Sequence, residues 1–326
     1  MDQEKSNRIK IIVKIVSFVL VTIALIGVVT LFLHPEHAAR YSDERSVEAN
    51  RIFDERENSI DVIFLGHSGV YSGISPMEIY KKYGFTSYDF SQARQLPWES
   101  LEMLKAVLKV QKPAVLVLET DQLFYDAGKN IAESFGRSLV HNFVPILKNH
   151  VAWKDWFNKG KKRERSITKG YKFSKDVKPF KGNKNWKPTD KAYKIKKSHL
   201  GPFKDICDLC KENDIPVLLL EVPSTKKWDY SKFNAVKKIS EEKGLPFIDM
   251  NQILEEFGFD WETDSRDKGD HLNYSGAVKV SDYLGKYLQD TYGLVSRKGD
   301  EKYASWEEDL CKYEKMIERE VNKNEP

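Results

Sequence analysis

The sequence predicts an α/β fold with a parallel β-sheet, preceded by a single transmembrane helix. Short apolar runs alternate with segments of helical periodicity between residues 60 and 292, and an uncharged run of 19 residues covers 15–33. The 326 residues are 40% hydrophobic and 31% charged, with three Cys and a net charge of +4. This composition excludes a disordered chain, a disulfide scaffold and a dedicated nucleic-acid binder.

The uncharged run has the length of a membrane span, since its 19 residues extend roughly 28 Å as a helix. With Lys14 reaching the interface, we expect an anchor in the bilayer at 11–33. The upstream basic residues place 1–10 in the cytoplasm and the main domain outside, as a single-pass protein of the cell membrane. A cleaved signal peptide is the alternative. The run is longer than a usual signal core and no small-residue cleavage site follows it directly, which favours the anchor.

After the anchor we expect a polar stalk at 34–58 and then a domain at 59–293. Five short apolar runs in this domain predict buried strands because each is short and is separated from the next by turn residues or a helical pattern. The predicted strands are 60–66, 86–90, 114–118, 217–222 and 246–250.

The segments between these runs have the periodicity of helices, and two of them start with Pro. The predicted helices are 76–83, 97–111, 203–213, 231–243 and about 275–292. Alternating strands and helices indicate a parallel sheet covered on both faces, whose functional site lies at the carboxyl ends of the strands. This rule selects the loops at 66–72, 91–95, 119–123 and 222–226.

A basic stretch interrupts the domain at 154–204. It holds eighteen Lys and Arg against four Asp and Glu, a net charge of +14, with aromatic residues between them. Two interpretations remain open: a solvated insertion, or a surface that contacts a polyanion, anionic lipid headgroups or a partner protein. For an exported domain, an anionic envelope polymer fits better than nucleic acid.

Ser68 is the first candidate for catalysis. It follows the first predicted strand in the run Gly66-His67-Ser68-Gly69, where glycines permit a tight turn that exposes a serine at the head of the sheet. Its backbone N–H, close to a helix start, can face an oxyanion. A serine after a strand can equally be a helix cap.

His271 supplies the base that such a serine needs. Asp270 is adjacent to it and Asp267 lies four residues before it, in the loop that opens the last helix. A nucleophilic serine requires a base for its proton, and the base requires a carboxylate that fixes its tautomer. A parallel sheet would bring these segments to one edge. Asp270 and His271 can also merely cap the last helix.

Four segments together make the chain similar to the SGNH (GDSL-like) hydrolase superfamily over about residues 61–292. They are DVIFLGHSGVYSGISP, FSQARQLPWESL, AVLVLETDQLF and GDHLNYSGAVKVSDYL. The chain most resembles the membrane-anchored branch that accompanies membrane-bound O-acyltransferases, which includes the teichoic acid D-alanyl transfer protein and the alginate acetylation proteins. The resemblance implies a flavodoxin-like SGNH three-layer fold. We expect no cofactor and no metal.

By this resemblance Ser68 is the nucleophile, His271 is the general base, and an Asp shortly before His271 orients the base. The Asp-x-x-His spacing of the superfamily falls on Lys268, so we expect Asp267 to take this role, with Asp270 as the alternative.

The Gly and Asn that usually complete the oxyanion hole of this superfamily have no clear equivalents here. The candidates for oxyanion or substrate contacts are Ser68, Gly69, Gln95, Asn273 and His67, and Gln95 is the favoured polar contact. A carboxylate at Asp121 would repel an oxyanion, so we expect Asp121 to serve another purpose.

These roles imply acyl-ester chemistry through an acyl-Ser68 intermediate. Water as acceptor would make the protein an esterase, and a hydroxyl of an envelope polysaccharide or teichoic acid would make it an O-acyltransferase. The branch implies transfer, with a membrane-bound O-acyltransferase as partner, and the basic stretch suits an anionic acceptor. The alternative is a non-catalytic, membrane-anchored scaffold that binds the polymer or the acyltransferase. A soluble esterase is a third hypothesis, against which the anchor counts.

Two further features are expected to be structural. Cys207 and Cys210 have the spacing of a metal or redox pair, but Phe203, Ile206 and Cys210 share one apolar helix face, which favours core cysteines. Residues 294–326 are expected to form a charged C-terminal tail, an exposed helix without a catalytic motif.

Overall fold

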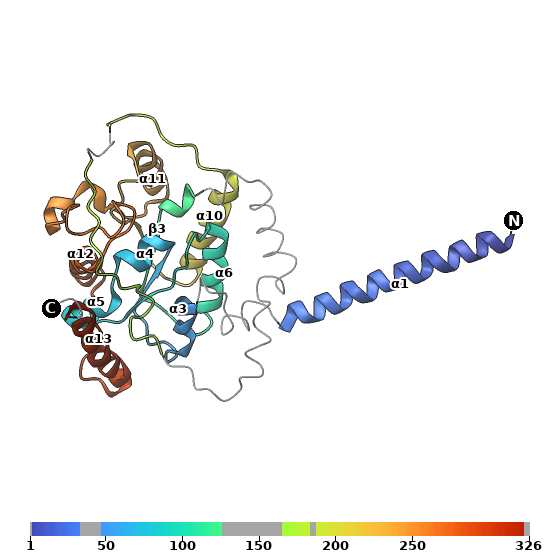
Figure 1. The fold of residues 1–326 in the computed structure, drawn as a ribbon, viewed down its shortest axis with the longest axis horizontal. Coiled ribbons are helices and arrows are strands. Elements are labelled where there is room, and N and C mark those ends of the chain that lie inside the picture. The colour runs from blue at the N-terminus through green and yellow to red at the C-terminus, as the bar shows by residue number, and fades with distance from the viewer. Residues whose placement is uncertain (1, 33–46, 126–164, 183–186, 323–326) are drawn as a thin grey trace. The chain divides into compact units, whose positions relative to one another are not determined.

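The computed structural model describes residues 2–32, 47–125, 165–182 and 187–322 (Figure 1). Its centre is a five-stranded sheet in which all neighbouring strands are parallel, in the order β2-β1-β3-β4-β5. The strands are β1 (Val62–Leu65), β2 (Ser87–Asp89), β3 (Val115–Glu119), β4 (Val217–Glu221) and β5 (Phe247–Asp249). Each coincides with a predicted strand to within two residues at either end, and the order is that of flavodoxin-like folds.

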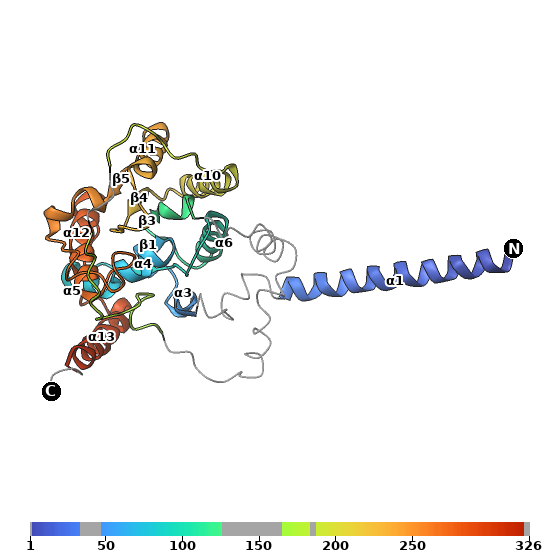
Figure 2. The ribbon, with the colours of Figure 1, turned by 45° about the horizontal axis from the view of Figure 1, so that its top comes forward.

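Helices cover both faces of this sheet because side chains alternate between the faces along each strand. Ile63 and Leu65 face a core shared with α6 (Pro97–Val107), α10 (Lys197–Glu212) and α11 (Tyr230–Lys243). Val62 and Phe64 face a second core, shared with α4 (Ser68–Gly73), α5 (Pro76–Tyr83) and α12 (Tyr274–Tyr292). Figure 2 shows α6 and α10 on one side of the sheet and α5 and α12 on the other. The predicted α/β fold with three layers is confirmed.

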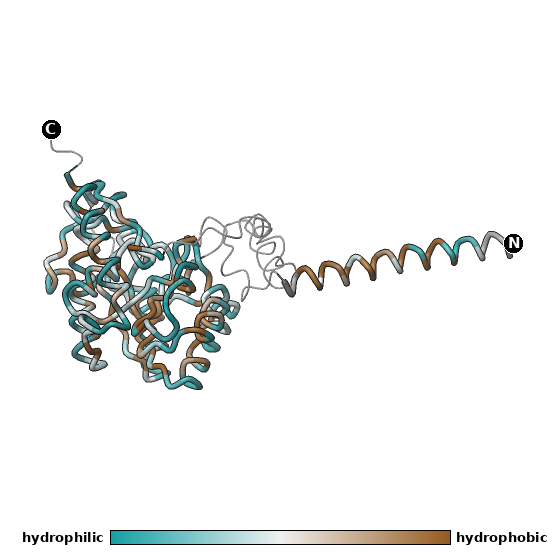
Figure 3. The backbone as a smooth tube through the Cα atoms, turned by 90° about the horizontal axis from the view of Figure 1, so that it is seen from below, coloured by the Kyte–Doolittle hydropathy of each residue, from teal (hydrophilic) through white to brown (hydrophobic). Residues whose placement is uncertain are grey.

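Helix α1 (Asp2–Phe32) contains the apolar run. Among the described residues it is the one helix long and apolar enough to cross a membrane, over Ser6–Val29. Figure 3 shows the apolar character of this part of the helix in brown. Its length and composition support a membrane span, and its orientation stays a prediction.

The segment after residue 46, predicted as the end of a stalk, packs on the domain instead. It forms α3 (Val47–Asn50) and a 3-10 turn, η1 (Arg51–Asp54). Ala49 and Ile52, three residues apart, are both buried in the core that contains α6 and α10. Residues 33–46 lie outside the described part of the chain.

The C-terminal segment is also part of the domain. After a 3-10 turn, η5 (Glu301–Tyr303), helix α13 (Ala304–Asn322) buries Trp306, Leu310 and Tyr313 against Met77 and Tyr80 of α5. The expectation of an exposed charged tail is therefore wrong for this helix. The spacing of its three apolar residues, four and then three, gives the helix one apolar face.

One lysine of the basic stretch lies inside the domain. The side chain of Lys169 is fully buried, and its Nζ lies 2.7 Å from Glu55 Oε1 and 2.7 Å from Asp309 Oδ2. The same Nζ lies 4.5 Å from the ring centre of Trp306. These contacts join the segment before β1, the basic stretch and α13.

The basic stretch is therefore not wholly a solvated insertion. Residues 165–182 run along the domain without helix or strand, and 197–204 form the first half of α10. Residues 187–196 also lack helix and strand, and 154–164 and 183–186 lie outside the described residues. Whether the stretch contacts an anionic surface stays a prediction.

Candidate active site

Ser68 is the first residue of α4, directly after the turn that follows β1. Gly66 makes this turn possible, because a Cβ at that position would lie 2.5 Å from the Cβ of Glu119 on the neighbouring strand. As the first residue of the helix, Ser68 has a backbone N–H without an acceptor inside the helix. Its side chain is half-buried at the carboxyl edge of the sheet.

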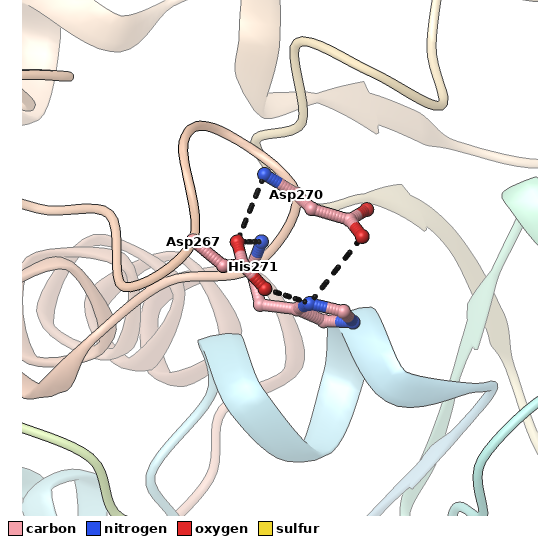
Figure 4. Close-up of side chains that lie close together, drawn as sticks. All are labelled: Asp267, Asp270 and His271. Atoms are coloured by element: carbon pink, nitrogen blue, oxygen red, sulfur yellow. Dashed lines mark hydrogen bonds and ion pairs between the residues drawn. The ribbon is translucent and has the colours of Figure 1, made fainter. Parts of the chain in front are cut away.

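His271 lies next to Ser68. Its Nε2 is 2.8 Å from Ser68 Oγ, and its Nδ1 is 2.6 Å from Asp267 Oδ2. Figure 4 shows the ring of His271 between the two Asp side chains of its loop and the pale blue helix α4. A carboxylate, an imidazole and a hydroxyl in this order form the arrangement that activates a serine.

The loop before His271 explains why the Asp lies four residues upstream. Lys268 and Gly269 both have positive φ, 66° and 84°, so the chain turns back on itself within this loop. Oδ1 of Asp267 accepts backbone hydrogen bonds from Asp270, at 3.1 Å, and from His271, at 2.6 Å. Asp270 Oδ2 lies 3.7 Å from Nδ1. Of the two carboxylates considered, Asp267 is the one that hydrogen-bonds to the imidazole.

Asp270 has a different partner, Lys227, which the sequence analysis did not identify. Nζ of Lys227 is 2.9 Å from Asp270 Oδ1 and 3.3 Å from His271 Nε2. Lys227 follows the loop 222–226 by one residue, so only its position after β4 could have indicated it. Its ammonium brings a positive charge to the side of the imidazole that faces Ser68.

Burial and the charge of Lys227 together lower the pKa of His271, and they outweigh the attraction of Asp267 and Asp270. The imidazole is therefore neutral at neutral pH and can accept a proton from Ser68. Burial opposes the charge of Asp267, but the side-chain and backbone hydrogen bonds from His271, together with the charges of His271 and Arg266, outweigh it and lower the pKa of that carboxyl, which keeps it ionised.

Replacing Lys227 by Gln is expected to raise the pKa of His271, because a positive charge is removed from beside Nε2. A base must be neutral to act, so the acidic limb of the kcat/KM profile for ester hydrolysis should move to higher pH. The measurement is this profile for the full-length protein in detergent, across the acidic and neutral range. Lys238→Gln, on the exposed face of α11, serves as the control. An acidic limb at the same pH in all three proteins would contradict this role of Lys227.

His67 is a buried cation beside the serine. Its Nδ1 is 3.0 Å from Glu119 Oε1 and its Nε2 is 2.9 Å from Asp121 Oδ2. Burial opposes the charge of this imidazole, but the charge of Glu119 and the hydrogen bond with Asp121 outweigh it and raise the pKa of His67 to about 9. Both carboxylates hold His67 behind the turn, so the structure places it as part of the support of Ser68.

The charge of His67 also decides what the N–H of Gly69 can do. This N–H lies 3.1 Å from Nδ1 of His67, the same nitrogen that faces Glu119. A protonated Nδ1 donates to Glu119 and cannot accept from Gly69. The N–H of Gly69 is then able to bind another acceptor, as the predicted oxyanion contact requires.

Asp121, in the loop after β3, serves another purpose than binding an oxyanion, as expected: its carboxylate pairs with His67 and Lys232. Burial would raise the pKa of this carboxyl, but His67 and Lys232, whose Nζ is 2.9 Å away, lower it to about 2. The neighbouring Glu221 behaves in the opposite way, since burial and the charges of Asp121 and Glu119 raise its pKa well above the ordinary value. Asp121 is therefore ionised at neutral pH, whereas the surroundings of Glu221 favour its neutral form.

Two predicted polar contacts are not brought to this site. Gln95 is fully buried, and its Oε1 accepts from the backbone of Gln92 while its Nε2 donates to Ser100. Asn273 caps α12, with its Oδ1 accepting from the backbone of Gly276. Nδ2 of Asn273 donates to the carbonyls of Asp176, at 3.2 Å, and Thr263, at 2.7 Å. The side-chain amides of both residues therefore bond within the protein, and neither residue lines the pocket between His67 and His271.

The pocket between His67 and His271 is small, with a volume of about 10 Å³. Glu221 and Lys227 also line it. A site of this size accepts a water molecule or a very small group. A larger substrate group does not fit in this pocket.

Asp267, Asp270 and His271 each offer an atom that could bind a metal ion, all within 4.8 Å of one another. These atoms have other partners here: Asp267 and His271 bond to each other, and Asp270 pairs with Lys227. An ammonium already lies where a cation would bind. The geometry therefore fits an activated serine better than a metal site.

Cys207 and Cys210 are unpaired. Cys210 is buried in the core that contains α6 and α10, and Cys207 packs against it. Burial raises the pKa of both thiols, to about 11 for Cys207 and about 12 for Cys210. The prediction of core cysteines is confirmed.

Comparisons with models of protein families and with curated proteins gave no match. Among solved structures, the chain is similar to a protein from Desulfitobacterium hafniense described as lipolytic and of the G-D-S-L family, with 10% identity, a TM-score of 0.41, and coverage of 71% of this chain and 100% of that one. It is also similar to a GDSL-like lipase from Bacteroides thetaiotaomicron, with 14% identity, a TM-score of 0.35, and coverage of 71% and 88%. TM-scores below 0.5 do not establish a common fold, so the chemistry of the site is inferred from this chain's own residues.

Proposed function

We propose that the protein is a membrane-anchored serine enzyme of the SGNH type that transfers or hydrolyses acyl esters. The observation that carries this proposal is the chain of hydrogen bonds from Asp267 through His271 to Ser68, with lengths of 2.6 and 2.8 Å. The neutral imidazole and the ionised carboxylate support it, because these are the states that the reaction needs.

The reaction proceeds in two steps. Ser68 Oγ attacks the carbonyl carbon of the acyl donor while its proton passes to Nε2 of His271, and the leaving oxygen then takes this proton. The resulting acyl-Ser68 is attacked by the acceptor oxygen, whose proton passes to Nε2 and from there to Ser68 as its ester bond breaks. The N–H groups of Ser68 and Gly69 and the ammonium of Lys227 are the nearby donors that can stabilise the oxyanion.

The acceptor is proposed to be a hydroxyl of an anionic envelope polysaccharide or teichoic acid. An anchor at the N-terminus and a basic stretch of net charge +14 support this, since both suit work at a membrane surface on a polyanion. A membrane-bound O-acyltransferase is the proposed partner that delivers the acyl group. This partner rests on the resemblance in sequence alone.

The test is the ester content of the envelope polymer in cells that carry Ser68→Ala. We expect a loss of alkali-labile acyl groups from the isolated polymer, with an unchanged amount of protein in the membrane. Ser198→Ala, an exposed serine of α10, is the matched control. Normal acylation in the Ser68→Ala cells would contradict the proposal and favour the non-catalytic scaffold.

A further inference from the structure

Glu119, the last residue of β3, is a buried carboxylate that no step of the proposed mechanism uses. Its side chain is 1% exposed and lies against the turn that carries Ser68. A Cβ at Gly66 would lie 2.7 Å from Oε2 of Glu119, and a Cβ at Gly69 would lie 2.9 Å from Oε1. Glycine at both positions therefore leaves room for this carboxylate.

Glu119 contacts His67 at two points. Its Oε2 accepts the backbone N–H of His67 at 3.1 Å, and its Oε1 lies 3.0 Å from Nδ1 of the imidazole. Among the residues that the structure describes, His67 is the group whose cation pairs with Glu119. A carboxylate buried to this degree needs a paired cation, so this contact favours a proton on Nδ1.

The same nitrogen has a second neighbour with the opposite requirement. The N–H of Gly69 lies 3.1 Å from Nδ1 and donates to it only when Nδ1 has a free lone pair. Nε2 is not in question, because Oδ2 of Asp121 lies 2.9 Å away and accepts its proton. The proton on Nδ1 therefore decides between two arrangements. Either Nδ1 pairs with Glu119 and the N–H of Gly69 is free, or Nδ1 accepts from Gly69.

A free N–H at Gly69 serves the reaction. Gly69 follows Ser68 at the start of α4, where N–H groups have no acceptor inside the helix. It also lines the small pocket beside Lys227 and His271. When Ser68 Oγ bonds to the carbonyl carbon and its proton passes to Nε2 of His271, the carbonyl oxygen becomes an oxyanion. An N–H next to this oxygen stabilises its charge.

We propose that Glu119 is a positioning residue of this reaction, which keeps the proton on Nδ1 of His67 and thereby leaves the N–H of Gly69 for the oxyanion. The inference rests on the proposed function. Once Nδ1 has lost its proton, it accepts from Gly69, and the oxyanion loses one donor.

Activity should then depend on the proton of His67. The titratable side chains that face this imidazole or line the pocket beside it are Glu119, Asp121, Tyr125, Glu221, Lys227, Asp270 and His271, with Lys232 paired to Asp121. Burial lowers the pKa of His67, but Glu119 and Asp121 outweigh it and raise this pKa to about 9. The proton is therefore present at neutral pH and is lost as the pH rises through this value.

The experiment measures kcat and KM for hydrolysis of p-nitrophenyl acetate from neutral to alkaline pH. Full-length protein in detergent is used, and the rate of the Ser68→Ala protein is subtracted at each pH. The variants are Glu119→Gln and Asp121→Asn, which each remove one carboxylate beside His67. Glu242→Gln, from an exposed ion pair of α11, is the matched control.

Two further variants test whether another group at this site causes the pH dependence. Lys227→Gln removes an ammonium that lines the same pocket, and Tyr125→Phe removes a phenol whose ring centre lies 6.3 Å from that of His67. Each should keep the alkaline fall in kcat, because neither holds the proton on Nδ1.

We expect kcat of the wild type and of Glu242→Gln to fall as the pH rises through about 9. In Glu119→Gln the anion that holds the proton on Nδ1 is gone, so Nδ1 accepts from Gly69 already at neutral pH. There kcat should be lower by about 10²–10³-fold, the effect of one lost oxyanion donor. KM should change much less, because the donor acts on charge that develops in the transition state.

Asp121→Asn should move the alkaline fall to lower pH, since it removes a charge that raises the pKa of His67. A merely structural role of Glu119 and Asp121 would lower kcat equally at every pH and leave the alkaline fall in place.

The proposal is overturned if kcat of the wild type does not fall at alkaline pH, or if the fall occurs at the same pH in the wild type and in Glu119→Gln. A fall that disappears in Lys227→Gln or in Tyr125→Phe would also overturn it. If Glu119→Gln does not fold, an unchanged alkaline fall in Asp121→Asn overturns the proposal instead. The proposed function fails separately, if Ser68→Ala keeps full hydrolysis of p-nitrophenyl acetate.

Discussion

Replacing Asp267 by Asn is expected to lower kcat for ester hydrolysis by about 10⁴-fold. The amide can still accept the backbone hydrogen bonds that Oδ1 receives from Asp270 and His271, so the loop is preserved. Its NH₂ group then faces Nδ1 and donates to it, which leaves the proton of the imidazole on Nε2. In that tautomer His271 cannot accept the proton of Ser68. The measurement is steady-state hydrolysis by the full-length protein.

Asp270→Asn is the matched control for this prediction. Asp270 lies 3.7 Å from Nδ1 and pairs with Lys227, so its loss should reduce kcat by no more than about tenfold. The opposite ranking of the two variants would assign the orienting role to Asp270.

Replacing Lys169 by Met is expected to lower the free energy of unfolding by about 3–5 kcal/mol. The substitution leaves the buried carboxylates of Glu55 and Asp309 without their shared cation, and it removes the contact with the Trp306 ring. Arg165 remains 3.1 Å from Asp309, so that carboxylate keeps part of its pairing. The measurement is urea denaturation followed by tryptophan fluorescence.

Lys178→Met is the control, since this lysine is exposed in the same segment. Its effect on the free energy of unfolding should stay within about 0.5 kcal/mol. A Lys169→Met protein as stable as this control would show that the buried ion pairs do not hold the basic stretch and α13 to the domain. Hydrolytic activity is a second readout. At low temperature, where the variant is folded, it should be unchanged, because Lys169 does not contact the serine or its base.

The sheet could be predicted from the sequence because its strands are short apolar runs and its helices have a clear period. The loops at 66–72, 119–123 and 222–226 were predicted from the rule on carboxyl ends, and they contain Ser68, Asp121 and Pro223, which meet around one site. The helical face of α13 was missed because its few apolar residues lie among many charges. The spacing of the apolar residues in α13, rather than its overall composition, indicates that one face of the helix is buried.

Within the site, residue types could be predicted more easily than their partners. Asp267 reaches the imidazole from four residues upstream because Lys268 and Gly269 have positive φ, which the sequence alone did not indicate. Gln95 was expected in the site because its loop reaches the sheet edge, but its amide turns inward to bond within the loop. The burial of Lys169 depends on Glu55 and Asp309, which lie more than a hundred residues away on either side of it. No local pattern could have indicated it.

Covalent labelling tests directly whether His271 activates Ser68. Full-length protein in membranes is treated with a fluorophosphonate probe beside Ser68→Ala, His271→Ala and the control Ser198→Ala. We expect labelling of the wild type and of Ser198→Ala, and its loss in both of the other variants. Labelling that persists without Ser68, or a folded wild-type protein that does not react, would contradict an activated serine at this site.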